Sequence, residues 1–183
     1  FQDFKKVFIP FLNPEQYGRS ILENSSFLVS SANPNPELHG TGFVARLSGA
    51  TAEFIHILMQ MAMGSRAFSV NEKGELNFSL NPVLPSWLFT EAAQKTNILV
   101  DGEMTEISTP SDSFTFMFLS DILVTYHNPS QKNTFGEDAV KPKSWVLTDG
   151  AGQTQTHEGA ILGQNFAQSI RSKQFRRIEI TLG

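Results

Sequence analysis

The sequence SFTFMFLSDILVTY, residues 113–126, decides the fold class of the second half of the chain. Phenylalanine occupies every second position of 114–118, and residues 122–126 repeat the alternation with Ile, Val and Tyr. A period of two places the apolar side chains on one face of a strand. The same period recurs in residues 76–80 and 178–182. Several short strands separated by Gly, Pro and Asn turns predict an antiparallel β-sandwich over residues 67–183.

Residues 50–63 have the opposite periodicity, because their apolar side chains follow helical spacing. Glu53, His56 and Gln60 form the only polar stripe, and Gly64 is suited to end a helix there. A helix that is apolar on nearly every side needs to be buried on nearly every side. We therefore predict a helix that lies in a core or against another domain.

The first third of the chain also has helical signals. Residues 13–15, Asn-Pro-Glu, are typical of a helix start. Apolar residues continue the pattern to Ser31, and the Asn-Pro-Asn-Pro sequence of residues 33–36 stops it. The predicted organisation is a helical segment over residues 1–66 followed by the sandwich, with one further short helix at residues 164–172.

Composition excludes several classes of function. The 183 residues have a formal net charge of -4, and no run of Lys or Arg exceeds two residues, which argues against nucleic acid. The absence of cysteine excludes disulfides and thiolate metal sites and is compatible with a reducing cytosol. The four histidines lie far apart, so we expect no metal site. No apolar run reaches the length of a membrane span, and we expect neither a leader nor a membrane anchor.

Residues 46–54, Arg-Leu-Ser-Gly-Ala-Thr-Ala-Glu-Phe, contain the strongest chemical signal. Ser48 and Gly49 precede the apolar helix, where unpaired backbone N–H groups and the positive end of the helix dipole favour an anion. The structural alternative is an ordinary N-cap, in which the Ser48 side chain only satisfies one N–H group. Both interpretations remain open from this stretch alone.

Other motifs are incomplete. The His-Gly-Thr-Gly sequence at residues 39–42 is similar to an oxyanion-hole segment, but the chain has no Gly-x-Ser-x-Gly nucleophile motif. Residues 149–152, Asp-Gly-Ala-Gly, lack the Gly-Lys-Ser/Thr ending of a phosphate loop and predict a loop or hairpin turn. Glu23 and Glu53 are the acids in apolar helical context. Neither is singled out as a proton donor.

Five segments occur in an order that resembles a known family. They are Tyr17-Gly18-Arg19-Ser20-Ile21-Leu22-Glu23, Leu38-His39-Gly40-Thr41-Gly42, Leu47-Ser48-Gly49-Ala50-Thr51-Ala52, Gly74-Glu75-Leu76 and Asn81-Pro82-Val83-Leu84-Pro85-Ser86-Trp87. The succession resembles the C-terminal part of the cellobiose phosphorylase family of inverting β-glucan phosphorylases. The resemblance covers residues 15–90, and beyond residue 113 it is a general strand pattern. It implies that residues 1–66 end a barrel of paired helices and that a C-terminal β-sandwich follows.

The resemblance also implies roles for individual residues. Ser48, with the amides of Gly49 and Ala50, corresponds to a phosphate-binding Thr-Gly pair, and Arg19 and Glu23 correspond to a sugar-binding segment. This chain departs from that segment, since Asn24-Ser25 stands where the family has Pro-Tyr.

The family's catalytic Asp lies upstream of the matched region, so no catalytic residue is assigned here and we expect the chain alone to be inactive. The implied partners are phosphate as co-substrate, a β-glucan or disaccharide, and the rest of the barrel, with a homodimer and a cytoplasmic location expected for the whole enzyme. No cofactor is expected.

The alternative is a non-catalytic module of carbohydrate-binding or purely structural type. Carbohydrate binding needs an exposed aromatic platform, and the candidates are Trp87, Trp145 and Tyr126.

Overall fold

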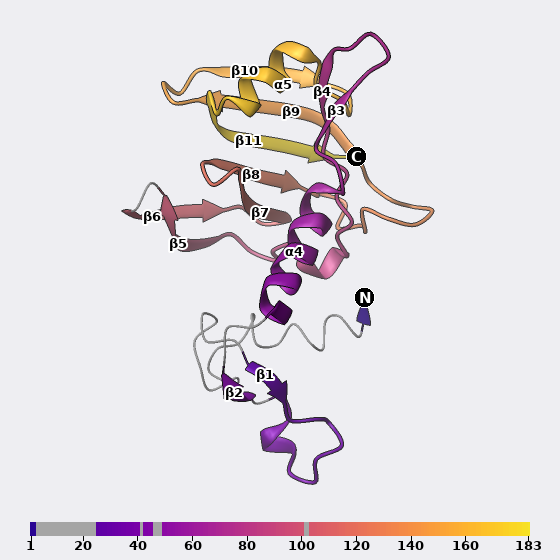
Figure 1. The fold of residues 1–183 in the computed structure, drawn as a ribbon, viewed down its shortest axis with the longest axis vertical. Helices are drawn as coiled ribbons and strands as arrows, with labels where there is room; N and C mark the ends of the chain where they lie inside the picture. The colour runs from indigo at the N-terminus through magenta and orange to yellow at the C-terminus, as the bar shows by residue number, and fades with distance from the viewer. Residues whose placement is uncertain (3–24, 41, 46–48, 101–102) are drawn as a thin grey trace. The chain divides into compact units, whose positions relative to one another are not determined.

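The computed structural model describes residues 1–2, 25–40, 42–45, 49–100 and 103–183 (Figure 1). The chain divides into two compact units, Phe1–Leu58 and Met59–Gly183, and each is described by itself. The described residues form two α-helices and several β-sheets, so the chain is of mixed α and β class and mostly β. This confirms the predicted class at that level.

The first unit contains a short hairpin where the sequence predicted a helix. β1 (Ser25–Leu28) pairs antiparallel with β2 (Gly42–Ala45), and the 3₁₀ helix Pro36–Leu38 lies between them. The predicted helix through Ser31 is therefore wrong over β1. Pairing with a distant strand outweighed the helical spacing of a short apolar segment. The helix start predicted at residues 13–15 lies outside the described residues.

The predicted central helix is confirmed as α4 (Gly49–Met63). It ends where expected, because Gly64 has a φ of +81° and its N–H donates to the Gln60 carbonyl at 2.7 Å. Met61 and Ala62 are buried, whereas Ile55 and Ile57 are 52% and 47% exposed. The end of α4 thus belongs to a core, and its middle turns carry exposed apolar side chains.

The main sheet of the second unit has five strands in the order β10-β9-β11-β8-β7 (Figure 1). Their bounds are β7 (Ser113–Phe118), β8 (Ile122–His127), β9 (Pro142–Asp149), β10 (Thr154–Glu158) and β11 (Phe175–Leu182).

The predicted antiparallel arrangement is wrong for one pair in this sheet. β11 runs parallel to β8 and antiparallel to β9, so the sheet is mixed. Apolar alternation identifies the buried face of a strand but not its neighbour, and the position of β11 between β8 and β9 was therefore not predictable from its sequence.

One face of this sheet forms the core. Its fully buried side chains include Tyr126 on β8, Trp145 on β9 and Ile178 on β11. α5 (Gln164–Arg171) confirms the short helix predicted at residues 164–172. Its Ala167 and Ile170 side chains are buried.

A second hairpin contributes aromatic side chains to the same core. It consists of β3 (Phe68–Val70) and β4 (Leu76–Phe78). The Phe78 ring lies 6.0 Å from the Trp145 ring and 5.6 Å from the Phe118 ring, between centroids. Reciprocal backbone hydrogen bonds of 2.8 and 2.9 Å join Phe78 to Leu162, so the hairpin is held by backbone as well as by ring packing.

The strands of the third hairpin were not predicted, although Asp101-Gly102, which lies between them and outside the described residues, is a candidate for a type I′ turn from its sequence. β5 (Gln94–Val100) pairs with β6 (Glu103–Thr109) along seven registered positions. Its polar and apolar residues do not alternate regularly, and most of β6 is exposed. The signal used to identify the other strands is therefore missing here.

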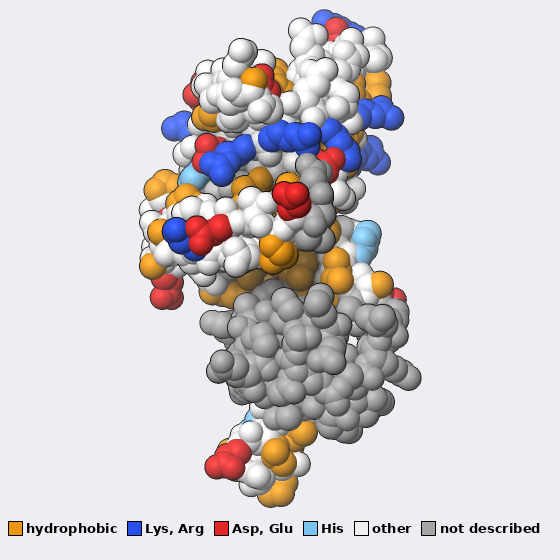
Figure 2. Space-filling model, turned by 90° about the vertical axis from the view of Figure 1, so that its left-hand side faces the viewer, with side chains coloured by type: hydrophobic (Ala, Val, Ile, Leu, Met, Phe, Trp, Pro, Cys, Tyr) orange, Lys and Arg blue, Asp and Glu red, His pale blue; other side chains and the backbone are white. Residues whose placement is uncertain are grey.

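Basic side chains gather where α5 ends and β11 begins. Arg171 closes α5, and Lys173, Arg176 and Arg177 follow. Figure 2 shows Lys and Arg side chains forming a band on the face of the molecule that includes this region. Lys173 Nζ lies 2.5 Å from Asp121 Oδ2. That hydrogen bond lowers the pKa of Asp121, and the charges of Lys173 and Arg176 act in the same direction.

This pair predicts an acid-dependent loss of stability. A carboxyl group whose folded pKa lies below its unfolded value stabilises the fold above the unfolded pKa, and this contribution disappears as pH falls through the folded pKa. We therefore expect the free energy of unfolding of Asp121→Asn, measured by urea unfolding, to decline less steeply than that of the parent chain as the pH is lowered from about 5 to about 2. Lys173→Met should show the same dependence of unfolding free energy on pH as Asp121→Asn. If both variants showed the pH dependence of the parent chain, the Lys173–Asp121 pair would not be the cause of the acid-dependent loss.

Candidate functional site

Two of the predicted phosphate-binding residues lie at the start of α4. Gly49 and Ala50 are its first two residues, and the first turn contains no acidic side chain. Early backbone N–H groups of a helix have no partner within it, and their dipoles sum to a partial positive charge. Ser48, Arg19 and Glu23 lie outside the described residues. The structure therefore places only Gly49 and Ala50 of the predicted site together.

The predicted aromatic platform is largely buried. Tyr126 is 0% and Trp145 is 1% exposed. The Tyr126 hydroxyl donates to the Ala62 carbonyl and Trp145 Nε1 donates to the Gly159 carbonyl, both at 2.7 Å. Burial raises the pKa of the Tyr126 hydroxyl well above its ordinary value. Of the three candidates, Trp87 alone is partly exposed, on the 3₁₀ helix Ser86–Leu88.

The described parts of the chain contain no group of three or more His, Asp or Glu residues that could hold a metal ion. His157 Nε2 lies within hydrogen-bond distance, 2.9 Å, of the Ile161 carbonyl oxygen. His127 Nε2 lies 3.4 Å from Glu179 Oε1. Within the described ranges, neither helix has the length and apolar content of a membrane span.

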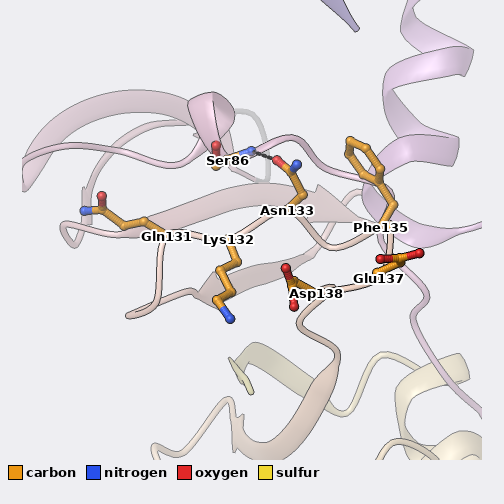
Figure 3. Close-up of a pocket in the computed structure, with 8 residues that line it drawn as sticks. Ser86, Gln131, Lys132, Asn133, Phe135, Glu137 and Asp138 are labelled. Carbon is orange, nitrogen blue, oxygen red and sulfur yellow. Dashed lines mark hydrogen bonds between the residues drawn. The ribbon is translucent and has the colours of Figure 1, made fainter.

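A pocket that the sequence did not predict lies between the 3₁₀ helix at Ser86 and the β8–β9 loop, residues 128–141 (Figure 3). Its volume is about 490 Å³. We call it the loop pocket, and it is lined by Ser86, Gln131, Lys132, Asn133, Phe135, Gly136, Glu137 and Asp138. No motif in the sequence predicts a site at Ser86 or at the loop residues.

Buried polar residues fix the β8–β9 loop. Thr134 is fully buried, and its Oγ1 donates to the Pro82 carbonyl and accepts from the Leu84 N–H, both at 2.7 Å. Asn128 is also fully buried, and its Nδ2 donates to the Lys132 carbonyl at 2.7 Å. Satisfied buried hydrogen bonds of this kind hold a loop in one conformation. The loop is thus built on the segment that precedes Ser86.

The Ser86 side of the pocket is joined directly to the loop. Asn133 Oδ1 accepts a hydrogen bond of 2.8 Å from the Ser86 backbone N–H. Gly136 has a φ of +90°, in the left-handed region that favours glycine, so the chain turns sharply between Phe135 and Glu137. The contact between Ser86 and Asn133 spans 47 residues, and no local pattern could have revealed it.

The charges of the loop pocket do not cancel. Lys132 contributes one positive charge, and Glu137 and Asp138 contribute one negative charge each. Among the residues that the structure describes, none forms an ion pair with these three. Figure 3 shows Lys132 and Asp138 extending from the loop on the side away from Ser86. Lys132, Glu137 and Asp138 are exposed, so their charged ends can reach a ligand at the mouth of the pocket.

Two other hollows adjoin α5. One, of about 520 Å³, is lined by Glu75, Asn77, His157, Gly163, Gln164, Asn165 and Phe166. The other, of about 610 Å³, is lined by Val70, Gly74, Leu76, Gln168, Arg171 and Ser172. The first lies beside the backbone hydrogen bonds between Phe78 and Leu162, and among the described residues neither has a fully buried polar side chain in or next to its lining like Thr134 of the loop pocket.

Comparison of the chain with protein families and with curated proteins found no match.

Proposed function

We propose that the chain is the C-terminal part of an inverting phosphorylase that converts β-linked glucosides and phosphate into a sugar 1-phosphate. The observation that carries this proposal is the start of α4 at Gly49, directly after Ser48. The Gly49 and Ala50 amides then occupy the positive end of a 15-residue helix. The ordered resemblance over residues 15–90 supplies the reaction class.

The proposed chemistry divides between this chain and the residues upstream of it. A phosphate oxygen attacks the anomeric carbon while the glycosidic oxygen leaves and takes a proton from an acid outside this chain. The Ser48 hydroxyl and the two amides hold the phosphate and offset its charge. Arg19 and Glu23 orient the sugar through its hydroxyl groups. Every bond that forms or breaks belongs to phosphate, sugar or the upstream acid.

The exposed apolar residues of α4 support a place within a larger assembly. Ile55 and Ile57 are each about half exposed in this chain. These two residues lie two positions apart and point to different sides of the helix, so neighbouring helices on more than one side would cover them. In the proposed enzyme the neighbours are the other helices of a paired-helix barrel, and the second unit follows as the terminal sandwich domain. The parallel pairing of β11 and β8 modifies the antiparallel arrangement expected for that domain.

Variants at the start of α4 test the phosphate assignment in the complete enzyme. Ser48→Ala removes one hydrogen bond to the anion, and Gly49→Val places a branched side chain at the amides. We expect each to raise the KM for phosphate about tenfold or more. The KM for the sugar should change much less. Steady-state phosphorolysis at varied phosphate concentration measures both.

Ser111→Ala is the matched control, because Ser111 is an exposed serine in a turn of the second unit. It should leave the KM for phosphate unchanged. A KM for phosphate in Ser48→Ala and Gly49→Val equal to that of Ser111→Ala would overturn the phosphate assignment.

The alternative, a non-catalytic carbohydrate-binding module, loses support because two of its three predicted platform residues are buried. Tyr126 and Trp145 cannot present a ring to a glycan, because both are enclosed in the core. The polar loop pocket is a different surface, and it does not depend on those two rings.

A further inference from the structure

We propose that the loop pocket binds a neutral β-linked oligosaccharide, through residues other than those at the start of α4. The choice of β-linked glucans as ligand rests on the proposed function, whereas the pocket's chemistry does not. Its volume of about 490 Å³ falls in the range of small-molecule sites, roughly 300–1,000 Å³. The site therefore accommodates a few sugar units and not an extended polymer surface.

The loop is organised before any ligand arrives. The buried Thr134 hydroxyl bridges Pro82 and Leu84, and the backbone N–H of Thr134 donates to the Leu84 carbonyl at 3.0 Å. Lys141 Nζ donates to the Thr134 carbonyl at 2.8 Å. A preorganised loop loses little conformational entropy on binding, which favours affinity for a small polar ligand. The side chains that line the pocket are thus carried by a fixed backbone.

The polar groups of the pocket match those of a sugar. Sugar hydroxyls both donate and accept hydrogen bonds. Glu137 and Asp138 are acceptors and Lys132 is a donor. Gln131 Nε2 donates to Asp112 Oδ1 and Asn133 Oδ1 accepts from the Ser86 N–H, so Gln131 offers its Oε1 as an acceptor and Asn133 offers its Nδ2 as a donor. Hydrogen bonds from a hydroxyl to a carboxylate are stronger than those between neutral groups. This mixture is suited to a polyol.

Phe135 adds an apolar surface to the same pocket. Its side chain is half-buried, and in Figure 3 its ring lies at the end of the pocket opposite Gln131. An aromatic ring is suited to the C–H face of a pyranose, since it offers a broad apolar contact beside polar groups. The pocket therefore offers one apolar contact and several hydrogen-bonding groups.

The net charge of the pocket lining and the lack of a metal-binding cluster among the described residues argue against an anion or a metal ion as the ligand. Two carboxylates and one ammonium give the lining a net charge of -1, which disfavours phosphate or a nucleic acid. Within the described ranges no cluster has the three acidic or histidine ligands of a metal site. A neutral ligand with many hydroxyl groups satisfies these constraints.

Calorimetric titration of the chain with cellobiose, cellotriose and laminaribiose tests this proposal. We expect saturable binding of at least one of them, with Kd raised about tenfold or more by Asp138→Ala and also raised by Lys132→Ala. Both side chains are exposed, so neither substitution disturbs the core. Circular dichroism in the near ultraviolet, which reports the packing of Trp145, verifies the fold of each variant.

Glu72→Ala is the matched control, since Glu72 is an exposed acid in the turn between β3 and β4. It should bind as the parent chain does. Absence of saturable binding for all three sugars, or equal affinities for Asp138→Ala and Glu72→Ala, would overturn the proposal. Loss of binding in Ser48→Ala would also overturn it, because the sugar would then depend on the start of α4.

The two proposals fail separately. Sugar binding that requires Asp138 in a protein without phosphorolysis would support the loop pocket and contradict the proposed enzyme. Phosphorolysis that depends on Ser48 in a protein whose Asp138→Ala variant binds sugars normally would do the reverse.

Discussion

Replacing Trp145 with alanine is expected to lower the free energy of unfolding by about 3–5 kcal/mol. Trp145 is 1% exposed and joins the main sheet to the β3–β4 hairpin through the Phe78 ring. Truncation removes this packing, leaves a cavity, and deprives the Gly159 carbonyl of its donor at 2.7 Å. Urea unfolding followed by far-ultraviolet circular dichroism measures the change.

Two further variants separate the loss of ring packing from the loss of the indole hydrogen bond and provide a surface control. Trp145→Phe keeps an aromatic ring and removes the indole donor, so it should cost less than Trp145→Ala. Val70→Ala truncates an apolar side chain that is 66% exposed, and its effect should be within about 0.5 kcal/mol of zero. A Trp145→Ala variant as stable as Val70→Ala would contradict the described core.

Substituting alanine for Gly64 should cost about 3 kcal/mol, from two contributions. The φ of +81° carries about 1–2 kcal/mol of strain for a residue with a Cβ. The added Cβ would also lie 2.9 Å from the Asn81 carbonyl oxygen and 3.1 Å from Asn81 Cβ. Relief of that contact requires the end of α4 or the segment after β4 to shift, at a cost of about 1–3 kcal/mol.

Gly74 provides a matched control for the steric contribution. It has a φ of +80°, but a Cβ there would meet nothing within 4 Å. Gly74→Ala should therefore show the strain of the left-handed backbone alone. Equal losses of unfolding free energy in Gly64→Ala and Gly74→Ala would mean that the close approach to Asn81 contributes nothing.

The elements that the sequence predicted best are those in which a local pattern and burial agree. The alternating residues of 114–118 and 122–126 form β7 and β8, and the apolar run of 50–63 forms most of α4. In each, the side-chain period matches the geometry of the element. The turn at residues 149–152 is likewise a hairpin connection, between β9 and β10.

The features that escaped prediction depend on contacts distant in sequence. β1 forms through pairing with β2, and β11 lies parallel to β8 although β9, β10 and α5 separate them along the chain. The loop pocket requires Asn133 to contact Ser86 and Thr134 to contact Leu84. None of these pairings changes the local periodicity.

The proposed phosphate site likewise depends partly on local sequence and partly on contacts distant in sequence. The start of a helix beside Ser48 follows from local sequence, and α4 does begin at Gly49. Whether an anion reaches those amides depends on the surrounding chain, including Arg19 and Glu23, which lie outside the described residues. The phosphate assignment therefore stands as a proposal that activity measurements decide.

Phosphorus NMR of the reaction between cellobiose and inorganic phosphate tests the central proposal most directly, in a protein that contains this chain together with the upstream acid that the proposal requires. We expect the signal of the α-anomer of glucose 1-phosphate to appear as cellobiose is consumed, with a rate that depends on phosphate and falls in Ser48→Ala. Release of glucose at a rate independent of phosphate, or no phosphate-dependent product from cellobiose, cellotriose or laminaribiose, would contradict the proposed phosphorolysis.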